Sequence, residues 1–169
     1  MPTVRLSFSP AAAHVRTARL VGVAVARRAG VAAELFDEIR LAIGEACSRA
    51  VALHREHDIT DLVEVDLVDG DRFTVRVTDR APIDAALGPV LPDPPDPVTL
   101  LDDDPTVPLG EAANEEAVAV GMRLALLIGI VDDLSVRPVE EGPGTEVLMS
   151  WPVRPGRNGG GGIRLTRHP

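Results

Sequence analysis

A carboxylate and a guanidinium in the segment EIRLAIGEACSRAV, residues 38–51, are the side chains best placed for chemistry. Glu45 and Arg49 are four positions apart, so a helix would bring both to one face. Two interpretations of this spacing stay open. The pair is either a solvated ion pair on the protein surface or part of a catalytic or nucleotide-binding site.

The pattern of apolar residues predicts the elements that position this pair. Alternation typical of half-buried strands occurs at 4–8, 62–68, 73–77, 134–137 and 146–151, and helical periodicity occurs at 11–28, 34–54 and 117–131. In the second helix the inward residues are expected to be Ile39, Ala42, Ile43, Ala46 and Ala50. This order predicts an α/β fold: a two-layer sandwich of a mixed, mainly antiparallel sheet with helices on one face.

Length and charge narrow the class of protein. The 169 residues suit one domain with a proper core, and the net charge of −9 argues against a nucleic-acid-binding protein. The single Cys excludes a disulfide framework and a Cys-based zinc site. No apolar run is long enough to span a bilayer and no signal segment opens the chain, so we expect a cytoplasmic protein.

Three parts of the chain differ in composition. Residues 1–153 are expected to form the folded domain, and within them residues 88–116 carry eight carboxylates, seven prolines and no basic residue. Such a segment is typical of a functional lid or of a disordered loop. The Gly-rich and basic residues 154–169 are expected to form a flexible tail.

Four short motifs follow one another in an order that is found in a known family. They are EACSRA at 45–50, VTDRAP at 77–82, VGMRLALLIGIVDDL at 120–134 and GPGTEV at 142–147. Together they resemble the anti-sigma-factor serine kinases of the GHKL, or histidine-kinase-like, ATPase superfamily, over roughly residues 1–153. The resemblance implies the Bergerat-type ATP-binding fold and a role in bacterial partner switching.

The first two motifs of this resemblance imply a base and an adenine contact. Glu45 would be the general base for phosphoryl transfer to a serine, and Asp79 would accept a hydrogen bond from the amino group of adenine. Arg49 stands where the family has an Asn that coordinates Mg²⁺, and a guanidinium has donors only. We expect Arg49 to pair either with phosphate oxygens or with Glu45. Ala81 and Ile83 replace two glycines of the family pattern.

The last two motifs imply contacts to the phosphates and to the back of the adenine. Gly121 and Met122 match a glycine-rich box at which backbone N–H groups and a helix N-terminus face the phosphates. Arg123 replaces the second glycine of that box and either adds a charge there or fills the space. Thr145 would lie behind the adenine, close to Asp79.

These features predict an anti-sigma regulatory factor with weak or lost ATP-dependent chemistry. It would bind and sequester a sigma factor and be released by an anti-anti-sigma antagonist of the STAS type. Binding of ATP or ADP is expected to be largely independent of Mg²⁺. One alternative is an active serine/threonine kinase that phosphorylates the antagonist; another is an unrelated α/β module. The resemblance also implies a homodimer, while the net charge and the short apolar runs predict no direct contact to nucleic acid or membrane.

Overall fold

The computed structural model describes residues 2–82 and 115–154, and it contains a sheet and a layer of helices. In chain order the elements are β1 Thr3–Phe8, α1 Ala12–Ala29, a 3-10 turn at Ala33–Leu35, α2 Phe36–Glu56, β2 Val63–Asp69, β3 Arg72–Thr78, α4 Glu115–Ile130, β4 Leu134–Pro138 and β5 Thr145–Pro152. The expected loop up to residue 114, the expected tail from residue 155 and Ile83 lie outside the described residues. Within the described ranges, no helix is long and apolar enough to cross a membrane.

One sheet contains the five strands that the described residues form, in the order β1-β2-β3-β5-β4, and each described pairing is antiparallel. The alternation of β2 separates its side chains by face. Val63, Val65 and Leu67 are buried, whereas Glu64 and Asp66 point to the opposite, half-exposed face. The predicted α/β sandwich with a mainly antiparallel sheet is confirmed.

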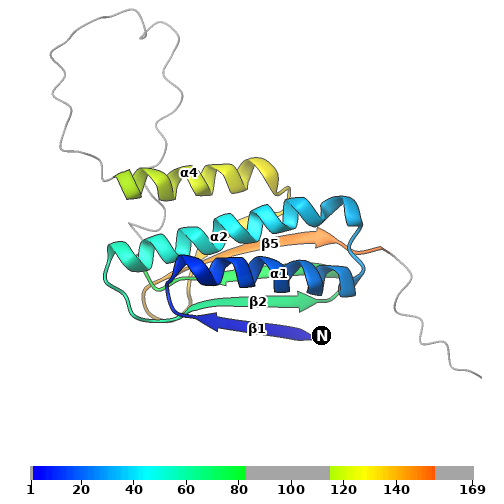
Figure 1. Ribbon diagram of the computed structural model, residues 1–169, viewed down its shortest axis with the longest axis horizontal. Helices are drawn as coiled ribbons and strands as arrows, with labels where there is room; N and C mark the ends of the chain where they lie inside the picture. Colours follow the sequence, from blue (N-terminus) through cyan, green and yellow to red (C-terminus); the bar gives the residue numbers. More distant parts are fainter. Residues whose placement is uncertain (1, 83–114, 155–169) are drawn as a thin grey trace, which may run out of the picture.

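The helices α1, α2 and α4 cover one face of the sheet, with α2 between the other two (Figure 1). The α1 and α2 axes lie close together because Gly22 has no side chain, and a Cβ there would overlap Ile43. The predicted inward residues of α2 are all fully buried: Ile39, Ala42, Ile43, Ala46 and Ala50. This packing fixes the side of α2 that faces α4 and the strand ends.

The two ends of α1 differ in how well the sequence predicts them. A glycine directly after the helical stretch predicts the end of the helix at Gly30. Gly30 does end it, in a left-handed conformation (φ 90°), and its N–H donates to the Arg27 carbonyl at 3.2 Å. At the other end, the sequence Ser9-Pro10 predicts an N-cap followed by a first-turn proline. This prediction is wrong, because the Ser9 carbonyl accepts from the N–H of Ala11 at 2.6 Å in a tight turn around Pro10. Ala11 is the N-cap instead, and it provides no side-chain cap.

Candidate functional site

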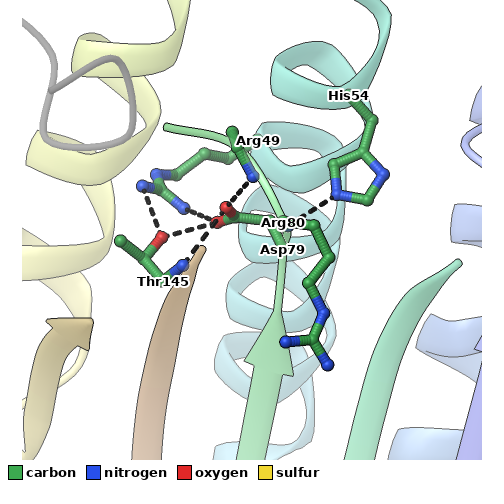
Figure 2. A network of polar contacts seen from close by, with 6 residues as sticks. Arg49, His54, Asp79, Arg80 and Thr145 are labelled. Carbon is green, nitrogen blue, oxygen red and sulfur yellow. Dashed lines mark hydrogen bonds and ion pairs between the residues drawn. The ribbon is translucent and has the colours of Figure 1, made fainter. Parts of the chain in front are cut away.

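Arg49 extends from α2 toward the ends of two neighbouring strands and forms an ion pair there (Figure 2). Its Nη1 donates to Asp79 Oδ2 at 2.9 Å, and its Nη2 donates to the Thr145 hydroxyl at 3.3 Å. Asp79 directly follows β3 and Thr145 begins β5, and these two strands pair antiparallel. The fold therefore brings together side chains from three distant segments of the chain.

Four hydrogen bonds converge on the carboxylate of Asp79. Oδ1 accepts from the N–H groups of Ala81 at 3.0 Å and of Thr145 at 3.3 Å. Oδ2 accepts from Arg49 and from the Thr145 hydroxyl at 2.6 Å. Because a carboxylate has about four acceptor sites, Asp79 has none left for a further donor. An adenine amino group, which the resemblance implies as a partner of Asp79, would have to replace one of these four donors, and this role of Asp79 stays a prediction.

This network is shielded from solvent. Arg49, Asp79 and Thr145 are each 1 % exposed. Burial lowers the pKa of Arg49 from its ordinary value, while the charge of Asp79 and its hydrogen bond oppose that shift. A guanidinium stays protonated in proteins, so the pair is ionic in the interior. Loss of either partner would leave the other as an uncompensated buried charge, which is strongly unfavourable.

His54 fixes the segment that follows β3 and so supports Asp79 (Figure 2). Its Nε2 accepts from the Arg80 N–H at 2.8 Å, so the ring proton is on Nδ1, which donates to the Asp61 carbonyl at 3.1 Å. Burial lowers the pKa of His54, which favours the neutral ring that this pattern requires. The described part of the chain contains no group of three His, Cys, Asp or Glu side chains placed to hold a metal ion.

Glu45 has its own partner on the neighbouring helix. Its Oε2 accepts from Arg123 Nη1 at 2.7 Å, and this ion pair links α2 to α4. The Glu45 side chain is 15 % exposed and that of Arg123 is 37 % exposed. Of the two partners expected for Arg49, phosphate oxygens or Glu45, the second is therefore wrong. Arg49 lies on the buried side of α2, where the carboxylate of Asp79 compensates its charge, whereas Glu45 lies nearer the surface.

The remaining predicted site residues within the described ranges lie in two places, one beside Asp79 and one on α4. Ala81 is fully buried, and its N–H is committed to Asp79. Gly121 and Met122 lie in the first half of α4; Met122 is 64 % exposed, and a Cβ at Gly121 would meet no atom within 4 Å. Their roles toward a nucleotide, like those of Glu45 and Arg123, stay predictions.

Two residues that support the network were not predicted from the sequence. One is His54, which lies five positions after Arg49 on α2 and is fully buried. The other is Gly144, at which φ is +131° and a Cβ would overlap the Asp79 carbonyl oxygen. The sequence signal for Gly144 was its place directly before Thr145. Glycine is favoured where two backbone segments approach closely, so a close contact at this position could have been predicted.

Comparisons with known proteins agree with this architecture. A family model described as the histidine kinase-like ATPase domain matches residues 8–151. Among solved structures, the chain is similar to the RsbU and RsbW domains of Rv1364c from Mycobacterium tuberculosis, with a TM-score of 0.54 and 16 % identity. That likeness covers 91 % of this chain and 34 % of the other, so this chain spans about a third of it. No curated protein matches the sequence. Because the family model covers most of its length, the chain belongs to the histidine kinase-like ATPase domain family.

Proposed function

We propose that this protein is an anti-sigma regulatory factor with weak or lost ATP-dependent chemistry. It binds and sequesters a sigma factor, and a STAS-type anti-anti-sigma antagonist releases it. Support comes from the family of the domain, from the four sequence motifs and from the likeness in fold to a structure that contains an RsbW domain. We further propose that it acts in the cytoplasm as a homodimer.

The buried network of Arg49, Asp79 and Thr145 is the observation that best supports weak or lost ATP-dependent chemistry. Arg49 stands where the family pattern has a metal-coordinating Asn, and a guanidinium cannot ligate a cation. An adenine amine would have to displace a donor that Asp79 already binds. Breaking a buried ion pair costs about 3–5 kcal/mol, which corresponds to a loss of roughly two to four orders of magnitude in nucleotide affinity.

An active serine/threonine kinase is the second candidate, and the position of Glu45 favours it. The carboxylate is not paired with Arg49, and its ion pair with Arg123 is partly exposed to solvent. Because this pair is less buried than that of Arg49 and Asp79, a substrate hydroxyl could replace Arg123 at a smaller cost than a ligand would need to separate the buried pair. Under this alternative, Glu45 would be the general base and another residue would have to hold Mg²⁺.

Reconstitution with purified partners tests both candidates. The chain is mixed with a panel of sigma factors and, separately, with STAS-type antagonists, and complexes are separated by size-exclusion chromatography with and without Mg-ATP. We expect a nucleotide-independent complex with one sigma factor, its dissociation by an antagonist, and no added phosphate on the antagonist by mass spectrometry. Phosphorylation that Glu45→Gln abolishes would establish the kinase instead. Failure to bind any sigma factor would contradict the proposal.

A further inference from the structure

The strand β1 lies at one edge of the sheet (Figure 1). In an antiparallel pair of strands, every second residue directs its backbone N–H and C=O groups toward the partner strand. The Pro2 carbonyl accepts from the N–H of Asp69 at 3.0 Å, which fixes this alternation in the pair of β1 and β2. The backbone groups of Thr3, Arg5 and Ser7 therefore point away from β2. Among the strands that the described residues form, β2 alone pairs with β1, so these groups can pair with a further strand.

The two edges of the sheet differ in how they are protected. The strand β4 at the other edge ends in Pro138, which has no N–H to donate. The strand β1 contains no proline over its six residues. Natural proteins commonly block an edge by keeping the strand short or by placing proline on it. The edge of β1 is therefore the more accessible template for an added strand.

An apolar cavity of about 140 Å³ lies beside this edge, between β1 and the first turns of α1. Its lining is predominantly apolar and consists of Leu6, Ser7, Phe8, His14, Thr17 and Ala18. The side chains of Val4, Leu6 and Phe8 pack against the core but are only half-buried. An engineered apolar cavity of about 150 Å³ binds benzene, so the cavity beside β1 has room for one large apolar side chain.

The two elements that border this cavity carry an excess of positive charge. Together β1 and α1 contain no carboxylate and five arginines: Arg5, Arg16, Arg19, Arg27 and Arg28. The first acidic residue of the chain is Glu34, although the net charge of the chain is −9. Arg5 pairs with Asp66, but its side chain stays 70 % exposed and can meet a charge on an added strand. A second copy would bring two basic edges together, whereas an acidic segment is complementary to this edge.

We propose that the open edge of β1 binds an extended segment of a partner protein in which carboxylates alternate with large apolar side chains. The backbone of the segment pairs with the outward groups of Thr3, Arg5 and Ser7. One of its apolar side chains enters the cavity beside α1, and its carboxylates lie beside Arg5 on the helix-free face of the sheet. In such strand addition, main-chain hydrogen bonds give affinity and pockets for alternate side chains give specificity. The proposal does not rest on the regulatory function proposed above, since it requires neither a sigma factor nor a nucleotide.

Amide hydrogen exchange of the ¹⁵N-labelled full chain, followed by NMR, tests the proposal. The probe is a short capped peptide in which Glu alternates with Val and Leu. We expect saturating peptide to slow exchange of the Arg5 and Ser7 N–H groups by about tenfold or more, and to change little at Leu6, which already pairs with β2. Protection of Arg5 and Ser7 in the peptide-free chain would show that a second copy or another part of the chain covers this edge, and would overturn the proposal.

Two control peptides separate strand addition from general attraction. A peptide that carries N-methyl groups on the amides that would face β1 cannot donate to the strand, so we expect its affinity to fall about tenfold or more. A peptide with Lys in place of Glu should also bind about tenfold more weakly, and this difference should shrink as the salt concentration rises. Equal affinity of either control and the acidic probe would overturn the proposal.

A matched pair of variants at Ser7 tests the edge from the side of the protein. Ser7→Pro removes an outward N–H and leaves the bonds to β2 in place, so it should weaken peptide binding about tenfold or more. Ser7→Ala keeps the N–H and should leave the affinity unchanged. Thr17→Trp leaves β1 unaltered and places a bulky ring at the cavity, so it should weaken binding to a similar extent. Equal affinities of the two Ser7 variants, or an unchanged affinity of Thr17→Trp, would overturn the proposal.

Discussion

Replacing Arg49 by Leu should destabilise the protein by about 3 kcal/mol. The substitution leaves the carboxylate of Asp79 buried without its cation, and removal of one partner from a buried ion pair costs about 3–5 kcal/mol. The lower end of this range applies because Ala81 and Thr145 would still donate three hydrogen bonds to Asp79. A second substitution, Asp79→Asn, removes the remaining charge, so the double variant should be more stable than Arg49→Leu alone.

Urea unfolding measures this change through the fluorescence of the chain's one tryptophan. Trp151 is 2 % exposed, so its emission should report loss of the core. The matched control is Arg40→Leu, which removes an exposed pair with Asp37 and should shift stability by no more than about 0.5 kcal/mol. A loss below about 1 kcal/mol for Arg49→Leu, or a double variant no more stable than the single one, would refute the reasoning.

Two further predictions concern the supports of the network. Because burial lowers the folded-state pKa of His54 below its unfolded value of about 6.5, stability should be fully present above that pH and be lost as the pH falls toward the folded pKa. Urea unfolding at pH 7 and pH 5 should show this loss of stability in the control variant His57→Gln, which keeps His54. The loss should be smaller in His54→Gln, which removes the buried ring, and equal losses in the two variants would contradict the role of His54. Gly144→Ala should destabilise by more than about 2 kcal/mol, since its Cβ would overlap Asp79 at φ +131°. The control is Gly142→Ala, at φ +79° in open space, which should lower the free energy of unfolding by about 1 kcal/mol in the same assay. Equal losses in the two variants would show that the close approach of Gly144 to Asp79 is unimportant.

The order and type of the elements were predictable because the hydrophobic periods were strong. The alternation in β2 and the helical stripe of α2 each had one apolar face, and the structure buries those faces. The start of α1 was predicted wrongly at Ser9, because the turn around Pro10 uses the Ser9 carbonyl before a helix can begin. Local sequence does not reveal such a competition between a turn and a cap.

The partner of Arg49 was not predictable from local spacing. Four positions separate it from Glu45, but the burial of its side of α2 places it against Asp79 and Thr145. One clue was present: Arg49 directly precedes the inward Ala50 and follows Ala46 by three positions, so the helical stripe includes it. Which carboxylate compensates a buried arginine depends on how strands from distant parts of the chain pair, and this requires the fold.

Calorimetric titration of ATP, with and without Mg²⁺, into the full chain and into Arg49→Asn tests the central claim most directly. The claim is that the buried pair of Arg49 and Asp79 closes the adenine site and excludes the metal. We expect weak binding to the unmodified chain with no dependence on Mg²⁺, and tighter, Mg²⁺-dependent binding to Arg49→Asn, whose folding the fluorescence of Trp151 verifies. Tight Mg²⁺-dependent binding of ATP by the unmodified chain would contradict the claim.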